Sequence, residues 1–193
     1  GGMDLKFPHH ECEIAQAVAV TGKQPVRYWV HGNMLKVNGQ KMSKSLGNSI
    51  LPRELLSGSH DLLDGPYNPM TVRFFMLQAH YGSTLDFSNE ALKAAEKGFR
   101  RLMEALQHLK EMNYEVKDKK TFREETDRRV REACERCYVN MSDDLNTAKT
   151  LAELFDLSAC VNAFHNGQLP GAVKKETFEL LQKTFSVFLV DIL

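Results

Sequence analysis

The 193-residue sequence lacks long apolar runs, a net charge and all but a few cysteines. Because no apolar run approaches the roughly 20 residues that span a bilayer, a membrane protein is excluded. Four cysteines are too few for a disulfide scaffold and, with a polar start that predicts no signal peptide, favour the cytoplasm. The charges of the 25 basic and 25 acidic residues cancel. Residues 1–87 carry 8 basic and 7 acidic side chains (+1), and residues 88–193 carry 17 and 18 (−1). Because both halves are nearly neutral, nonspecific nucleic-acid binding is not indicated.

Residues 1–87 combine the patterns of helices and strands. Pro8 suits the first turn of a helix, the β-branched and aromatic run Val26–His31 favours a strand, and Asn38-Gly39 is typical of a hairpin turn. The predicted elements are a helix over 9–20, strands over Val26–His31 and Met34–Val37, a polar loop over Lys41–Asn48, and helices over Pro52–Ser57 and Pro69–Tyr81.

Residues 88–193 have a helical pattern throughout. Ser88 or Asn89 can cap the first helix, and apolar residues then recur at spacings of three and four. Further helices are predicted over Phe122–Met141, Thr147–His165 and Ala172–Leu193, with breaks at Asn113–Lys120 and Asn166–Gly171. Helices joined by short connections predict an antiparallel bundle.

The first candidate site is the run Pro8–Glu13. On a helix that begins at Pro8, His9 and Glu13 lie one turn apart and could together bind one Zn²⁺. Cys12 could compete for that role. The alternative is a polar helix start whose glutamates complement the helix dipole.

The second candidate site is Lys41-Met42-Ser43-Lys44-Ser45. Two ammonium groups and two hydroxyls on a loop after a hairpin suit a polyphosphate, because lysine can follow charge that develops on a leaving pyrophosphate. By composition alone, a solvated basic loop remains an equal alternative.

These two motifs resemble those of a known family. Lys41–Ser45 resembles the second ATP signature of class I aminoacyl-tRNA synthetases, and Gly1–Gln16 resembles the matching run of one family in that class, the cysteinyl-tRNA synthetases. Tyr28–His31 also matches that family, and Asp143–Thr147 with Leu154–Leu157 match it more weakly. The resemblance implies a predominantly helical chain, in which an α/β remnant of a Rossmann-type catalytic domain (1–87) precedes an all-α, tRNA-binding bundle of the anticodon-binding type (88–193).

The resemblance also implies residue roles at the amino-acid site. His9 and Glu13 would be ligands of one Zn²⁺, Asp4 would face the amino group of bound cysteine, and Trp29 would lie near the active site. Cys12 stands where the family commonly has Asn, so it is not an expected ligand.

At the ATP site, Lys44 is the implied catalytic contact to the phosphates of Mg²⁺-bound ATP, and Lys41 supports the same loop. The hydroxyls of Ser43 and Ser45 complete the implied ATP-binding set. The implied reaction is the ATP-dependent ligation of L-cysteine to tRNA(Cys) through a cysteinyl-adenylate, with Zn²⁺ selecting the substrate thiolate. The expected protein is a cytoplasmic monomer with tRNA(Cys), L-cysteine and ATP as partners.

The family's other two zinc ligands, both cysteines, and its His-Ile-Gly-His motif lie upstream of the run that Gly1 begins. We therefore expect this chain to be an internal fragment that is inactive alone. Two alternatives stay open: a related ligase that joins cysteine to an aminosugar, and a non-catalytic helical interaction module.

Two features of the helical part have competing interpretations. Basic side chains at helical spacing could contact tRNA phosphates or form a solvated face paired with nearby glutamates; they are Lys93, Lys97, Arg100 and Arg101. Cys134 and Cys137 have the spacing of half a zinc ribbon, but without a second pair they are expected to be ordinary helix positions.

Overall fold

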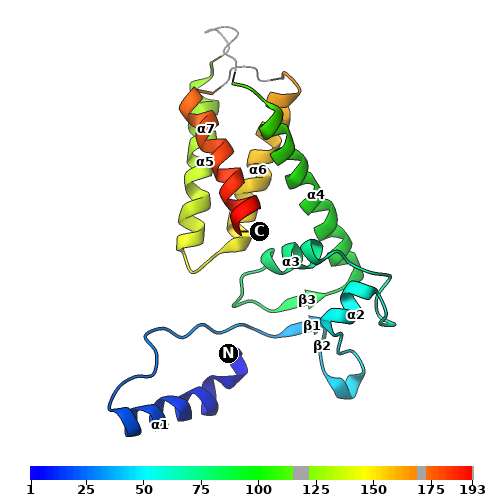
Figure 1. Ribbon diagram of the computed structural model, residues 1–193, viewed down its shortest axis with the longest axis vertical. Helices are drawn as coiled ribbons and strands as arrows, with labels where there is room; N and C mark the ends of the chain where they lie inside the picture. Colours follow the sequence, from blue (N-terminus) through cyan, green and yellow to red (C-terminus); the bar gives the residue numbers. More distant parts are fainter. Residues whose placement is uncertain (115–121, 169–172, 193) are drawn as a thin grey trace. The chain divides into compact units, whose positions relative to one another are not determined.

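The structure is a computed structural model, and it describes residues 1–114, 122–168 and 173–192. The helices are α1 (Glu11–Thr21), α2 (Pro52–Ser57), α3 (Pro69–Leu77), α4 (Asn89–Glu111), α5 (Glu124–Ser142), α6 (Thr147–His165) and α7 (Lys175–Ser186), and the strands are β1 (Leu35–Val37), β2 (Gln40–Lys41) and β3 (Leu85–Phe87) (Figure 1). Short helical turns cover Met3–Leu5, Lys6–His10, Lys44–Leu46 and Val187–Ile192. Within the described ranges, no helix has the length and apolarity needed to cross a bilayer.

The chain divides into two compact units. Unit 1 comprises Gly1–Tyr67 and Ala79–Ala91, and unit 2 comprises Asn68–Gln78 and the chain from Leu92 onward. Helix α3 therefore belongs with the bundle, although it lies among residues 1–87.

The predicted hairpin is confirmed in unit 1. β1 pairs antiparallel with β2, and Asn38 and Gly39 adopt the positive φ angles, 48° and 77°, that a two-residue turn needs. The sequence analysis did not predict β3, which pairs parallel to the other edge of β1 and gives the strand order β2-β1-β3. Val37 and Phe87 are buried, so this small sheet forms part of the core of unit 1.

The predicted strand Val26–His31 is wrong. This segment has no ladder in the described part of the chain, and its neighbour Gly32 makes only an isolated bridge to Gly2. Tyr28 and Val30 are 86% and 59% exposed. The contacts of this segment with residues 1–3 amount to single hydrogen bonds around that bridge, such as Met3 N–H to Gly32 C=O at 2.9 Å.

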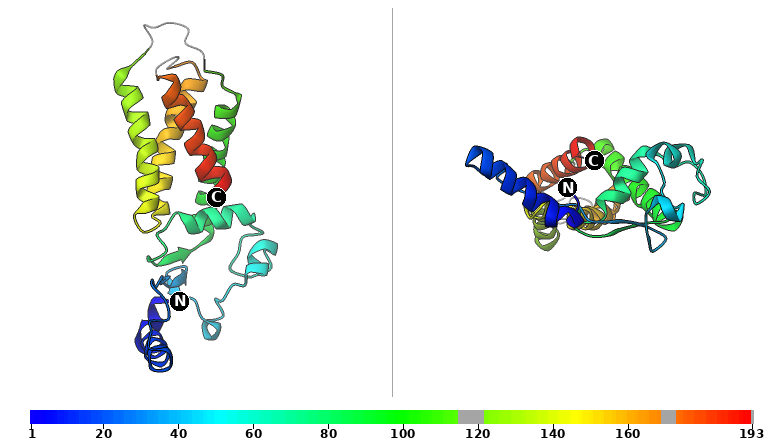
Figure 2. Two further views of the ribbon diagram at one scale, coloured as in Figure 1. Left: turned by 60° about the vertical axis from the view of Figure 1, so that its left-hand side comes forward. Right: turned by 90° about the horizontal axis from the view of Figure 1, so that it is seen from below.

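Unit 2 contains the predicted helical bundle, in which α4, α5, α6 and α7 run side by side (Figures 1 and 2). Ser88 Oγ accepts a hydrogen bond from the backbone N–H of Ala91, so the expected cap of α4 is present. The 3.6-residue pattern is confirmed by burial, since Leu92, Ala95, Leu102 and Leu106 of α4 all face the core.

Most predicted helix bounds agree with the structure. Thr147–His165 is reproduced residue for residue, and the helix predicted over Pro69–Tyr81 ends earlier, at Leu77. Ala172 and Leu193, the predicted limits of the last helix, lie outside the described residues, as does most of the predicted break at Asn113–Lys120.

A glycine in α4 explains how α3 joins the bundle. Phe74 of α3 is fully buried and packs on Phe99 and Phe155, with ring centroids 5.7 and 6.3 Å apart. A Cβ on Gly98 would lie only 3.2–3.3 Å from the rings of Phe155 and Phe74. Gly98 therefore allows two aromatic side chains, Phe74 and Phe155, to pack against α4 at close range.

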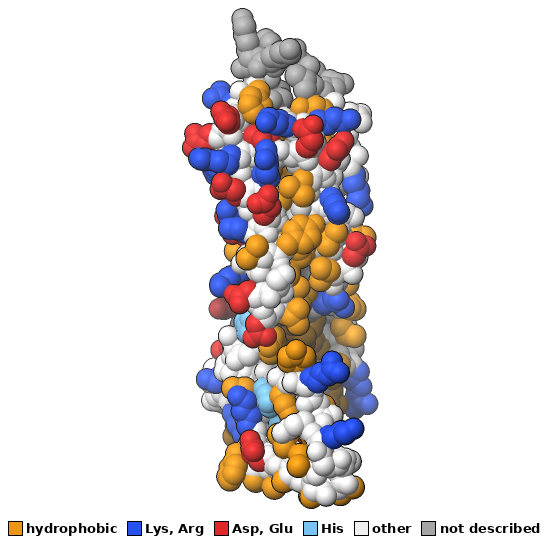
Figure 3. All heavy atoms as spheres, turned by 90° about the vertical axis from the view of Figure 1, so that its left-hand side faces the viewer, with side chains coloured by type: hydrophobic (Ala, Val, Ile, Leu, Met, Phe, Trp, Pro, Cys, Tyr) orange, Lys and Arg blue, Asp and Glu red, His pale blue; other side chains and the backbone are white. Residues whose placement is uncertain are grey.

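Basic and acidic side chains are interspersed on the face of the bundle shown in Figure 3. Several of them pair within or between helices. Arg136 of α5 makes two hydrogen bonds, of 2.8 and 2.9 Å, to the carboxylate of Glu153 of α6, whereas Arg128 and Glu132 form an exposed pair along α5 at 3.9 Å.

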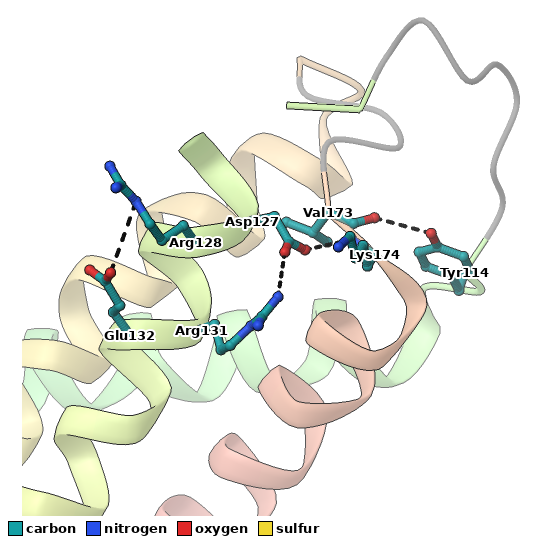
Figure 4. Close-up of polar contacts among 7 residues, drawn as sticks. All are labelled: Tyr114, Asp127, Arg128, Arg131, Glu132, Val173 and Lys174. Carbon is teal, nitrogen blue, oxygen red and sulfur yellow. Dashed lines mark hydrogen bonds and ion pairs between the residues drawn. The ribbon is translucent and has the colours of Figure 1, made fainter. Parts of the chain in front are cut away.

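A buried carboxylate links the start of α5 to the start of α7 (Figure 4). Asp127 is 3% exposed and accepts hydrogen bonds from the backbone N–H of Lys174 at 2.7 Å and from Arg131 at 2.8 Å. Burial opposes ionisation, but these hydrogen bonds, a third from Thr177 and the charge of Arg131 outweigh it and lower the pKa of Asp127.

Candidate functional site

The predicted metal-binding pair lies where the chain enters α1. His9 belongs to the turn Lys6–His10 and Glu13 to the first turn of α1, so the α-helix begins at Glu11 and not at Pro8. Both side chains are exposed. No three His, Cys, Asp or Glu side chains gather into a metal-binding group within the described ranges. Both side chains are thus accessible to a ligand, and their role in binding zinc stays a prediction.

The next residue, His10, is buried, with 9% of its surface exposed. Its Nδ1 lies 2.9 Å from Nε2 of His31, and its ring packs on Trp29 with centroids 4.8 Å apart. Trp29 and His31 also stack, at 6.0 Å and an interplanar angle of 15°. The structure thus brings Trp29 beside the turn that carries His9, through contact with His10.

The rings of His10 and His31 form a hydrogen bond in which one nitrogen donates and the other accepts. Desolvation, assisted by the positive charges of Lys6 and His10, lowers the pKa of His31. A neutral His31 ring at pH 7 can serve as the donor or the acceptor of this bond.

The two glycines that open the chain lie against this cluster. A Cβ on Gly1 would clash with the imidazole of His10, and a Cβ on Gly2 would clash with the carboxylate of Asp4. The backbone is held by hydrogen bonds from Met3 N–H to Gly32 C=O (2.9 Å) and from Gly32 N–H to Gly1 C=O (3.0 Å). Asp4 itself is exposed in the turn Met3–Leu5, free to meet a ligand.

Asn48 holds the loop Lys41–Ser45, here called the lysine loop, by two hydrogen bonds to its backbone. This side chain is 7% exposed; its Oδ1 accepts from the backbone N–H of Ser43 at 2.8 Å, and its Nδ2 donates to the carbonyl of Lys41 at 3.1 Å. Ser43 Oγ accepts from the N–H of Leu46 and so caps the turn that contains Lys44. Lys41 and Lys44 are exposed, as a phosphate-binding role requires.

The four basic side chains of α4 that the sequence singled out, Lys93, Lys97, Arg100 and Arg101, are exposed. Arg100 lies 3.5 Å from Glu96 in an i,i+4 ion pair, and the guanidinium of Arg101 lies 5.6 Å from the ring centroid of Phe155. These contacts are compatible both with a face that binds tRNA phosphates and with a solvated face of ion pairs.

Cys134 and Cys137 are ordinary core positions of α5, as expected. Both are fully buried, and burial raises the pKa of the Cys134 thiol to about 11 and that of Cys137 to about 12. Neither cysteine belongs to a group of three possible metal ligands among the described residues.

Three polar residues of the site were not predicted from the sequence: His10, His31 and Asn48. All three act through contacts inside the protein. The Gly47-Asn48 pair that closes the lysine loop was a usable turn signal, whereas nothing in the sequence distinguishes the buried His10 from the exposed His9.

Two family models match the chain. Residues 1–97 match the model described as tRNA synthetases class I (C) catalytic domain, and residues 136–190 match the DALR domain. The α/β unit with its lysine loop, followed by a helical bundle, is thus that of a class I synthetase. The chain belongs to the family of class I (C) tRNA synthetases, which confirms the resemblance to cysteinyl-tRNA synthetases.

Curated relatives agree along the whole chain. It is 52% identical over 193 residues to the cysteine–tRNA ligase of Porphyromonas gingivalis, and 50% identical over 197 residues to that of Cytophaga hutchinsonii. Each match covers 100% of this chain but only 37% and 39% of the respective relative. The chain therefore spans about two fifths of the length of these relatives.

A solved structure supports the fold. The LeuRS chain of a ternary LeuRS-tRNA-LeuAMS complex from Agrobacterium radiobacter K84 superposes with a TM-score of 0.64 at 16% identity, over 97% of this chain and 25% of that one. At this identity the likeness concerns the fold alone.

Proposed function

We propose that the protein that carries this chain ligates L-cysteine to tRNA(Cys) through a cysteinyl-adenylate. The observation that carries the proposal is the loop Lys41–Ser45, held by Asn48 after a hairpin, in a chain about half identical to proteins named cysteine–tRNA ligase. By itself the chain would be inactive, because it offers only part of the proposed zinc site.

In the first step, the carboxylate of cysteine attacks the α-phosphate of ATP and pyrophosphate leaves. Lys44 stabilises the negative charge that develops on the α-phosphate and the departing pyrophosphate, and Lys41 supports it from the same loop. The hydroxyls of Ser43 and Ser45, 3.2 Å apart, add hydrogen-bonding groups at the loop. Mg²⁺ would accompany ATP, as with other polyphosphate substrates.

The substrate thiol is recognised at the entry to α1. His9 and Glu13 would hold Zn²⁺ together with ligands from parts of the longer protein that this chain does not span. Zinc prefers a thiolate over the alcohol of serine, so the site can reject this close analogue. Asp4 would receive the ammonium group of cysteine, and Trp29 would form an apolar wall nearby.

The bundle would bind tRNA. In this proposal, residues 1–87 complete the catalytic domain, and residues 88–193 contact the tRNA, with Lys93, Lys97, Arg100 and Arg101 facing phosphates. The match to the DALR domain favours a tRNA substrate over an aminosugar or a purely structural role. The protein would act as a monomer in the cytoplasm.

The lysine loop can be tested by substitution. In the full-length protein, Lys44→Ala should slow cysteine-dependent ATP–pyrophosphate exchange by roughly 100- to 1,000-fold, the usual cost of losing one donor that stabilises developing charge. Lys36→Ala is the matched control, because Lys36 is exposed on the same hairpin outside the loop. An unchanged rate in Lys44→Ala would remove this lysine from the mechanism.

A further inference from the structure

His10 is the buried polar side chain of the N-terminal segment to which the proposed chemistry gives no role. Across the segment 6–21, His10 is the one buried residue, and α1 contains none. Among the described residues, therefore, little apolar burial holds the direction of this helix. The turn before it is also irregular, because Phe7 departs from helical geometry (φ −130°, ψ 132°) and is 80% exposed.

Three segments meet at the His10 ring. It hydrogen-bonds to His31, packs on Trp29, and lies so close to Gly1 that no side chain fits there. The first residues of the chain and Gly32 are joined by backbone hydrogen bonds. His10 thus connects the turn before α1 to the two segments that form its base.

We infer that His10 is a positioning residue, which through its hydrogen bond to His31 orients the turn so that His9 and Glu13 reach the same metal ion. Consecutive residues of a helical turn point in different directions. His9 is therefore exposed for a ligand while His10 holds the turn in place. The inference rests on the proposed function, since it assumes the zinc site at His9 and Glu13.

The test compares three variants of the full-length protein that carries this chain. His10→Phe keeps a ring against Trp29 but loses the hydrogen bond, and His10→Asn places an amide where Nδ1 lies. His9→Ala removes the proposed ligand itself. For each, the Zn²⁺ dissociation constant is measured by competition with a chromophoric chelator, and the visible spectrum of the Co²⁺ form reports the ligand geometry.

We expect His10→Phe to raise the Zn²⁺ dissociation constant by roughly 10- to 100-fold, as for other residues that orient metal ligands, and to change the Co²⁺ spectrum. His10→Asn should restore both. Zinc binding by His10→Phe equal to the unsubstituted protein would overturn the inference. Failure of a folded His10→Asn to recover would also overturn it, because the amide keeps the hydrogen bond to His31 on which the inference depends.

The two levels of the proposal can be separated. If His9→Ala binds zinc normally, the proposed metal site itself fails; if His9→Ala loses zinc but His10→Phe does not, only the positioning role fails. Should His10→Phe not fold, the same comparison at the partner residue, His31→Leu against His31→Gln, decides the question, because glutamine places an amide near the position of Nε2.

Discussion

Individual polar residues of unit 1 divide into exposed side chains, for which ligand contacts are proposed, and buried ones that hold the backbone. His9 and Lys44 are exposed, and each has a buried neighbour, His10 and Asn48, that fixes its turn or loop. Motifs predict the exposed kind, because ligand chemistry restricts those residue types. The role of His10 could not be predicted, because its partner His31 lies 21 residues away.

The cysteines provide a test of burial at this scale. Cys12 is exposed, whereas Cys134 and Cys137 are buried with strongly raised thiol pKa values. Because the thiolate is the reactive form, iodoacetamide at neutral pH should modify Cys12 rapidly and the two α5 cysteines only after denaturation. Peptide mass mapping over time measures this order.

The control for the labelling experiment is Cys12→Ser, which should remove the fast phase and leave the rest unchanged. Rapid modification of Cys134 or Cys137 in the folded chain would contradict their placement in the core.

Among elements, length decides what the sequence could predict. The helices of the bundle run for many turns, so their apolar period was clear, and α6 was predicted to the residue. β3 has only three residues, and it is recognisable as a strand only because it pairs with β1. Conversely, Val26–His31 has strand-like residues but pairs with no strand in the described part of the chain, which is why the prediction there was wrong.

The link between α5 and α7 predicts a pH-dependent stability. Asp127→Asn should destabilise the chain by about 1.5–3 kcal/mol at pH 7, the usual contribution of hydrogen bonds to a charged group. The folded-state pKa of Asp127 is lowered. Its contribution is therefore complete above the unfolded aspartate pKa of about 3.9 and is lost as the pH falls through the lowered value. Urea denaturation at pH 7 and between about pH 2 and 4 measures this.

Glu132→Gln is the matched control, because it removes only exposed pairs on the same helix, with Arg128 at 3.9 Å and with Arg136 at 4.0 Å. Such pairs contribute about 0–1 kcal/mol, so little change is expected. Equal losses in the two variants, or an Asp127→Asn effect that persists undiminished below the folded pKa, would contradict the role assigned to Asp127.

In the whole chain, each unit would serve a different part of the proposed reaction. Unit 1 contains the proposed amino-acid and ATP sites, and unit 2 contains the proposed tRNA contacts. The sequence placed the boundary near residue 87, whereas the contacts of Phe74 group α3 with the bundle. This grouping depends on aromatic packing between residues 25 and 81 positions apart, which local patterns do not reveal. The class of fold was predictable because the two motifs, Gly1–Gln16 and Lys41–Ser45, each have a specific order of residues.

The central claim is that a metal ion held in part by His9 and Glu13 selects sulfur over oxygen before tRNA is charged. The most direct measurement is ATP–pyrophosphate exchange by the zinc-loaded full-length protein, with cysteine or serine supplied alone at equal concentrations. The account predicts exchange with cysteine and almost none with serine, and loss of the cysteine signal in His9→Ala. Comparable exchange with serine would contradict it.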